Sequence, residues 1–100
     1  MATTSKALAR TAAATTSTTL YTVPSSTTTI VTNIAVCNNA ASSATFTLLL
    51  DDVELQKDST VAANSTVYID LKQVLATTKT IKGLASATTV DFHISGVEIS

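Results

Sequence analysis

Apolar and polar residues alternate with a period of two along most of the chain from residue 18 onward, which is typical of β-strands with one buried face. This alternation predicts strands over residues 18–23, 27–38, 44–50, 65–71, 80–85 and 88–99. In the second strand we expect one face to carry Ile30, Thr32, Ile34 and Val36. In the last strand the phase changes after Gly96, and a β-bulge at this glycine explains the change.

A tight hairpin is predicted around Asp51-Asp52, because these two residues separate two apolar runs. In a two-residue hairpin Leu50 and Val53 pair and share a face, so turn and hydrophobic pattern agree. We expect residues 57–64 to form a loop with only a weak extended stretch.

One short segment has a helical pattern instead. Leu71, Val74 and Leu75 are spaced i, i+3 and i+4, which predicts a single helical turn capping one end of the body. About seven short strands with turn signals between them indicate an all-β fold, an antiparallel β-sandwich. Jelly-roll and immunoglobulin-like strand orders both fit this pattern.

Residues 1–17 differ from the rest, because they contain Ala, Thr and Ser with no periodic apolar face. We therefore divide the chain into an extended low-complexity N-terminal arm, residues 1–17, and a β-sandwich domain, residues 18–100. Lys6 and Arg10 give the arm a charge of +2 and lie four residues apart, on the same side of an extended chain. The sequence predicts that these two cations bind acidic groups of a partner, and that the body folds without the arm.

Composition narrows the classes of function. The chain of 100 residues contains 21 Thr and 11 Ser, only 13% charged residues, and a net charge of −1, which argues against electrostatic binding of nucleic acid. The first 20 residues lack the apolar run of a secretory signal, and no run is long enough to span a bilayer. Cys37 is the only cysteine, so an internal disulfide is impossible.

Few residues offer candidate chemistry. Asp91, His93 and Ser95 form a polar row on one strand face, but three neighbours on a flat strand build neither a pocket nor an oxyanion hole. The acidic residues Asp51, Asp52 and Glu54 belong to a solvated turn, and a metal site at His93 would lack further ligands. We predict no catalytic residues, no cofactor and no metal, and hence a protein that is not an enzyme.

Three short motifs carry a family resemblance: Tyr21-Thr22-Val23-Pro24, then Asn33-x-x-x-Cys37-Asn38, and Ile94-Ser95-Gly96-Val97-Glu98-Ile99. Across residues 20–99 the chain resembles small virion structural proteins of tailed bacteriophages. The resemblance implies a β-sandwich building block, either a head decoration (cement) protein or a tail-associated component, with no catalytic residues to transfer.

The predicted function is that of a capsid cement protein that binds the major capsid protein as a symmetric homo-oligomer. Outward apolar residues such as Val31, Leu49 and Tyr68 could form the subunit interface. The presumed threefold lattice points favour a trimer, although the sequence itself does not select trimer over dimer. The expected location is the virion, after synthesis in the host cytoplasm, with no nucleic-acid or membrane partner. The alternative is a tail or fibre component that binds a host surface glycan.

Overall fold

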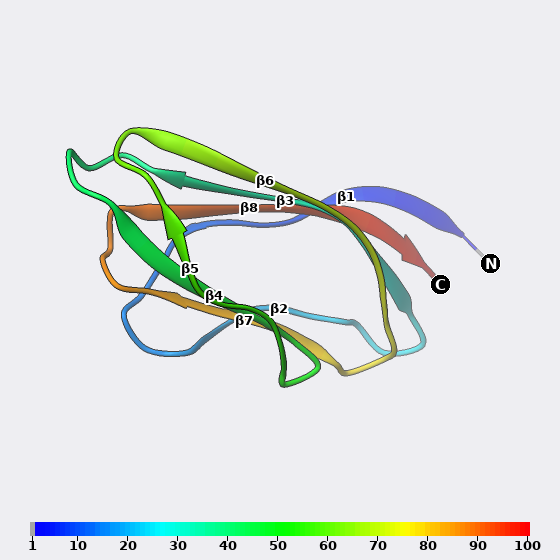
Figure 1. Cartoon of the computed structure of the whole chain (residues 1–100). Helices are drawn as coiled ribbons and strands as arrows, with labels where there is room; N and C mark the ends of the chain where they lie inside the picture. The colour runs from blue at the N-terminus through cyan, green and yellow to red at the C-terminus, as the bar shows by residue number, and fades with distance from the viewer. Residues whose placement is uncertain (1) are drawn as a thin grey trace.

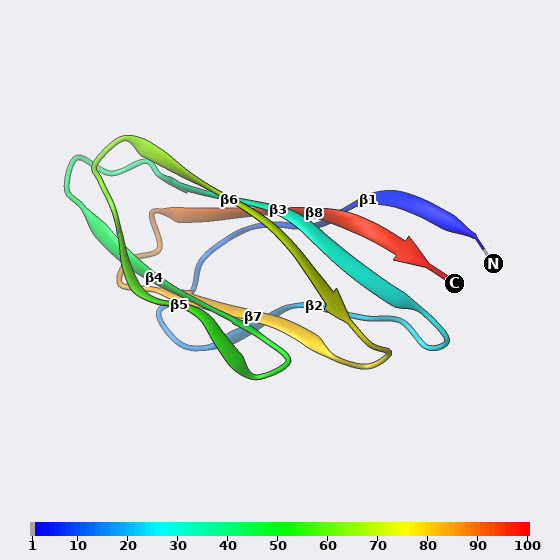
Figure 2. The ribbon, with the colours of Figure 1, turned by 45° about the vertical axis from the view of Figure 1, so that its right-hand side comes forward.

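The computed structural model describes residues 2–100, which form two stacked antiparallel sheets of four strands each (Figure 1). Sheet A contains, in spatial order, β1 (Thr3–Ala12), β8 (Val90–Ile99), β3 (Thr28–Asn38) and β6 (Ser65–Leu75). Sheet B contains β2 (Thr18–Thr22), β7 (Thr80–Ala85), β4 (Ala44–Leu50) and β5 (Val53–Val61). The two layers remain separate in a second view (Figure 2), so the predicted all-β sandwich is confirmed.

The strand order decides between the two sandwich topologies that the sequence left open. Hydrogen bonds pair β1 with β8, β2 with β7, β3 with β6, and β4 with β5, so the chain is one long hairpin folded over on itself. Eight strands in the orders 1-8-3-6 and 2-7-4-5 constitute a jelly roll. The molecule is elongated, with extents of 46 × 21 × 17 Å.

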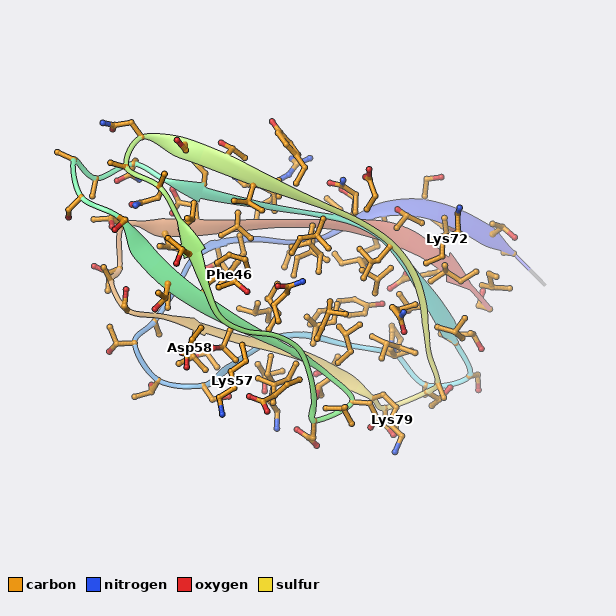
Figure 3. The ribbon with its side chains drawn as sticks, in the orientation of Figure 1. Phe46, Lys57, Asp58, Lys72 and Lys79 are labelled. Atoms are coloured by element: carbon orange, nitrogen blue, oxygen red, sulfur yellow. The ribbon has the colours of Figure 1, made fainter. Side chains whose placement is uncertain are left out.

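The core lies between the layers and consists of the inward residues of both sheets. Phe46 of β4 and Phe92 of β8 meet at its centre, with ring centroids 6.3 Å apart and an interplanar angle of 71°. This edge-to-face arrangement is one of the preferred geometries for aromatic pairs. Figure 3 shows Phe46 pointing into the space between the sheets. The buried core cluster to which it belongs consists mainly of Val, Ile, Leu and Ala side chains.

The N-terminal segment is extended, as predicted, but it is not separate from the sandwich. Residues 3–12 form β1, an edge strand that pairs with β8 from Thr3–Ile99 to Ala12–Asp91. Leu8 is buried against the core, and so is Ala13 just beyond the strand. The boundary predicted at residue 17 is therefore corrected, because main-chain pairing incorporates a segment that has little apolar surface of its own.

The prediction of a bulge at Gly96 is wrong. Along β8 the side chains alternate between inward and outward without interruption, and each of the two neighbouring strands contains an extra residue instead. Leu8 is inserted in β1, and Thr32 is inserted in β3, relative to an uninterrupted β8. Gly96 faces inward between them. A methyl group there would overlap the carbonyl oxygen of Ile30 and lie 2.9 Å from Cδ1 of Leu8.

The bulge in β3 also changes which of its residues are buried. Before Thr32 the inward positions are Thr29 and Val31, whereas Ile30 faces outward and is half-buried. The prediction that Ile30 and Thr32 share a face with Ile34 and Val36 is thus wrong. The bulge separates these two residues from the inward Ile34 and Val36. Val31, expected to point outward, is fully buried.

No helical turn forms at Leu71, Val74 and Leu75, and this prediction is corrected. Strand β6 continues to Leu75, which is buried, while Val74 is exposed. Two residues of β6, Leu71 and Lys72, lie opposite the single residue Thr32 of β3. Pairing with β3 makes this segment a strand despite its helical spacing of apolar residues. The bulge explains why Leu71, Val74 and Leu75 do not follow the alternation of a regular strand.

The hairpin at Asp51-Asp52 is confirmed. Leu50 pairs with Val53, and the φ angles of Asp51 and Asp52 are 55° and 60°, as a type I′ turn requires. The following strand is longer than predicted, because β5 continues through irregular pairing as far as Val61. No helix in the described residues is long and apolar enough to cross a bilayer.

Candidate interaction surface

The two cations predicted to bind a partner do not lie on the same side of their strand. The extra residue Leu8 separates them, so Lys6 pairs with the inward Gly96 whereas Arg10 pairs with the outward, exposed His93. Lys6 already has an acidic partner in its own chain, since its Nζ lies 3.4 Å from the Glu98 carboxylate. Within residues 2–100 no carboxylate forms an ion pair with Arg10.

Lys6 belongs to a polar network that the sequence analysis missed. The Tyr21 hydroxyl, on sheet B, donates a hydrogen bond to the Glu98 carboxylate on sheet A and also lies 2.8 Å from Oγ1 of Thr29. The hydrogen bond from Tyr21 holds the pKa of Glu98 below its ordinary value, and Lys6 acts in the same direction. Burial, together with the hydrogen bond to Glu98, raises the pKa of Tyr21 to about 12.

A second missed residue is Asn38, whose amide is buried at the opposite end of the sandwich. Its Nδ2 donates to the carbonyl oxygens of Ser42 at 2.8 Å and Val61 at 3.3 Å. Its Oδ1 accepts from the Ala40 amide at 3.1 Å and the Thr89 hydroxyl at 3.2 Å. The side chain thus connects three loops, and only its position beside a polar loop signalled this role.

The row of Asp91, His93 and Ser95 faces outward along β8. Asp91 accepts a hydrogen bond from the Asn39 amide at 3.1 Å. No side-chain hydrogen bond joins His93 to either neighbour in the part of the chain that the structure describes. The arrangement supplies no base oriented toward a nucleophile, and the row is part of an open sheet surface.

The outer side of sheet B is the charged side of the molecule. Three ion pairs lie there, at 2.7–3.7 Å: Lys82–Asp52, Lys79–Asp51 and Lys57–Glu54. Figure 3 shows Lys57 and Lys79 projecting from this sheet away from the core. The acidic turn is exposed, as predicted, and its three carboxylates, those of Asp51, Asp52 and Glu54, each face a lysine. Leu49 is half-buried on this side.

The outer face of sheet A has a different character, and the pairing register fixes how its residues align. We use this name for four cross-strand rows that run from β1 through β8 and β3 to β6. These rows are Ala12–Asp91–Cys37–Thr66, Arg10–His93–Ala35–Tyr68, Ala7–Ser95–Asn33–Asp70 and Ser5–Val97–Ile30–Val74.

Small and apolar side chains dominate the middle of this face. Ile30, Val97 and Ala35 are half-buried on its central strands, and Tyr68 and Val74 stand out from β6 with 72% and 67% of their surface exposed. Protein interfaces are depleted of charge at their centre and enriched in Tyr. This face is therefore the surface of the molecule best suited to contact another macromolecule.

Two open hollows lie on the surface. One, of about 540 Å³, borders the outer face of sheet A at Thr32, Asp70, Leu71 and Lys72. The other, of about 250 Å³, lies on the sheet B side and is lined by four Thr or Ser residues, by Asp58, and by the apolar Phe46, Leu84 and Ala85. The first hollow contains one acidic and one basic residue, Asp70 and Lys72, and the second contains one titratable residue, Asp58.

No three His, Cys, Asp or Glu side chains gather closely enough to hold a metal ion within residues 2–100. Cys37 is a free, half-buried thiol on the outer face of sheet A. No known family model matches the chain, and no curated protein is significantly similar to it.

Proposed function

We propose that this protein is a structural virion protein, a head decoration or cement protein of a tailed bacteriophage. In this role it binds the major capsid protein as a symmetric homo-oligomer and stabilises the shell without catalysing a reaction. The observation that carries the proposal is the difference between the two outer faces. Sheet B presents three ion pairs to solvent, whereas the outer face of sheet A carries Ile30, Ala35 and Val97 on its central strands and the exposed Tyr68 and Val74 at one edge.

The architecture supports the same conclusion. Jelly rolls occur in viral capsid domains and in lectins. One fold serves many functions, so the jelly roll supports the capsid role together with the outer face of sheet A. The motifs at residues 21–24 and 94–99 that resemble phage virion proteins lie on β2 and β8, at the end of the sandwich where Tyr21 meets Glu98.

Symmetry sets what the oligomer could be. The local threefold points expected on a phage shell suit a trimer, and a twofold dimer is the commonest closed oligomer in general. In either case the chain acts by binding across neighbouring capsid subunits.

The test compares purified phage heads with and without the protein. Heads that carry it should rupture at a higher temperature, as measured by release of packaged DNA, and an equal mass of an unrelated protein should have no effect. Equal rupture temperatures for both preparations would overturn the proposal.

One specific observation favours a second candidate, a tail or fibre module that binds a host surface glycan. The exposed Tyr68 ring lies beside Asn33 and Asp70, whose side chains are joined by a hydrogen bond of 3.2 Å. An aromatic platform beside an amide and a carboxylate suits a sugar ring. Binding on a glycan array that disappears in Tyr68→Ala and persists in Tyr21→Phe would favour this candidate over cementing.

A further inference from the structure

We propose that the outer face of sheet A binds the same face of a second copy, so that β1 of each copy lies over β6 of the other. This inference rests on the proposed function, since it names the contact that forms the homo-oligomer. The juxtaposition that carries it is the cation Arg10 at one edge of the face and Tyr68 with Asp70 at the opposite edge.

The arrangement follows from the register of the strands. The twofold axis of this dimer runs parallel to the strands, between β8 and β3, and lies between the two facing sheets. Rotation about it places each cross-strand row against the same row of the second copy, with the order of the strands reversed. Residues of β1 then face residues of β6 in the second copy, and residues of β8 face those of β3. A twofold interface must be self-complementary, so each of these pairings has to be favourable or neutral.

The edges of the face meet this requirement through charge. Arg10 of one copy faces Tyr68 of the second copy, with Asp70 one row away on the same strand. A guanidinium over an aromatic ring and beside a carboxylate gains both cation–π and ionic attraction. Within one chain the two groups cannot meet, because three strand spacings of about 4.8 Å separate β1 from β6.

The centre of the face meets the requirement through size and polarity. Val97 faces Ile30 of the second copy, which buries apolar surface, and Ser95 faces Asn33, which pairs polar groups. His93 faces the small Ala35. In these three pairings a large side chain lies opposite a small one, or the partners have like polarity. The end row places Asp91, which already accepts a hydrogen bond from Asn39, opposite Cys37.

The other twofold axis in the plane of the face, perpendicular to the strands, gives a poorer match. Placed at the centre of the face, it exchanges the row of Arg10 with the row of Asp70, so that each strand faces its own copy. Arg10 then faces Ala7 of the second copy and remains three strands away from the carboxylate of Asp70. The register therefore favours the axis that brings Arg10 to the carboxylate.

The area is sufficient for a specific contact. Four strands about 4.8 Å apart and about eight residues long at ~3.3 Å each span about 500 Å² per copy. Two copies together bury about 1,000 Å², which is near the lower limit of specific interfaces. The dimer should therefore form at micromolar concentration and be sensitive to single substitutions.

Sedimentation velocity of the isolated full chain, from about 1 to 200 µM, tests the proposal with a charge-swap design. Arg10→Glu places an added carboxylate against Asp70 twice in the dimer, and Asp70→Lys places an added ammonium against Arg10 twice. Each variant alone should dimerise at least about tenfold more weakly than the unmodified chain. An equimolar mixture of the two should recover dimerisation, because both contacts then join opposite charges.

Lys57→Glu is the matched control, since it makes the same change in charge on sheet B. It should leave dimerisation unchanged, and circular dichroism should show all variants folded. A monomer at every concentration, a loss in the control equal to that in Arg10→Glu, or no recovery in the mixture would overturn the proposal. A monomeric chain that binds heads or glycans and loses this binding in Arg10→Glu would assign the face to that other occupant. Because no phage heads are used in the sedimentation assay, its result is separate from the outcome of the heating test.

Discussion

The hydroxyl of Tyr21, on β2 in sheet B, donates a hydrogen bond to the carboxylate of Glu98, on β8 in sheet A. It is a direct polar connection between the two layers at the end of the sandwich where β1 begins. The same hydroxyl contacts Oγ1 of Thr29, and Lys6 approaches the carboxylate from β1. Four strands thus meet at one half-buried carboxylate.

Removing this hydroxyl should destabilise the fold. Tyr21→Phe keeps the ring but leaves Glu98 and Thr29 without their partner, so the free energy of unfolding should fall by about 1–2 kcal/mol. Urea denaturation measures the change. Tyr68→Phe is the control, because its exposed hydroxyl should contribute less than about 0.5 kcal/mol. Equal effects of the two variants would contradict the assigned role of Tyr21.

Acid should weaken the same connection. The pKa of Glu98 is lowered in the folded chain, chiefly by the hydrogen bond from Tyr21, so its contribution to stability is complete above its ordinary pKa of 4.5. That contribution is lost as the pH falls through the lowered value, because the carboxylate becomes protonated. The difference in stability between the unmodified chain and Glu98→Gln should therefore shrink between pH 5 and strong acid. Parallel pH profiles would show that Glu98 plays no such part.

Alkali should act on the other member of the pair. The pKa of Tyr21 is raised to about 12, so its contribution to stability is complete below the ordinary value of 10.0 and is lost as the pH rises toward 12. In Tyr68→Phe the only remaining tyrosine is Tyr21, and its ultraviolet titration should have a midpoint near 12. A midpoint near 10 would mean that the hydroxyl is free in solution.

The two glycines of the chain should respond differently to an added methyl group. Gly96→Ala forces the new group against the backbone carbonyl of Ile30, which cannot move without shifting β3, and should cost about 1–3 kcal/mol. At Gly83 the close atoms are the ends of the Leu20, Leu48 and Phe92 side chains, at 2.9–3.2 Å, which can adjust. Thermal unfolding should rank Gly96→Ala below Gly83→Ala, and the reverse order would argue against an uninterrupted β8.

Removal of residues 2–17 should destabilise the body, contrary to the expectation from sequence. The deletion exposes the edge of β8 and removes Leu8, which covers the core, so the loss should be at least about 3 kcal/mol. Differential scanning calorimetry of the truncated chain measures it. An unchanged midpoint would restore the interpretation of the segment as an independent arm.

The sequence predicted most accurately those strands and turns whose limits depend only on residues adjacent in the chain. Strands β4 (Ala44–Leu50) and β7 (Thr80–Ala85) have the predicted bounds, because polar turn or loop residues lie on both sides of each strand. The hairpin at Asp51-Asp52 was predicted from the two-residue break between apolar runs and from the shared face of Leu50 and Val53. These features depend on neighbours in the chain, and a single sequence contains that information.

The failures occurred where a distant strand decides the local structure. Small Ala, Thr and Ser residues in β1 carry no pattern, and their strand exists because β8, some 90 residues away, offers its edge. The bulges at Leu8 and Thr32 reverse the faces of their strands, which is why Lys6 and Arg10 were wrongly placed together. The Tyr21–Glu98 contact joins residues 77 positions apart and has no local signal.

The position of β8 has a consequence for biosynthesis. It lies between β1 and β3 in sheet A, yet it is the last of the eight strands to leave the ribosome. At about 5–20 residues per second, β1 and β3 wait seconds for the strand that joins them, so sheet A closes only after β8 emerges. Pairing across nearly the whole chain also makes closure slow, as for other proteins rich in non-local contacts. Nascent chains therefore spend this interval with unpaired strand edges, and chaperone supply rather than final stability should limit their yield.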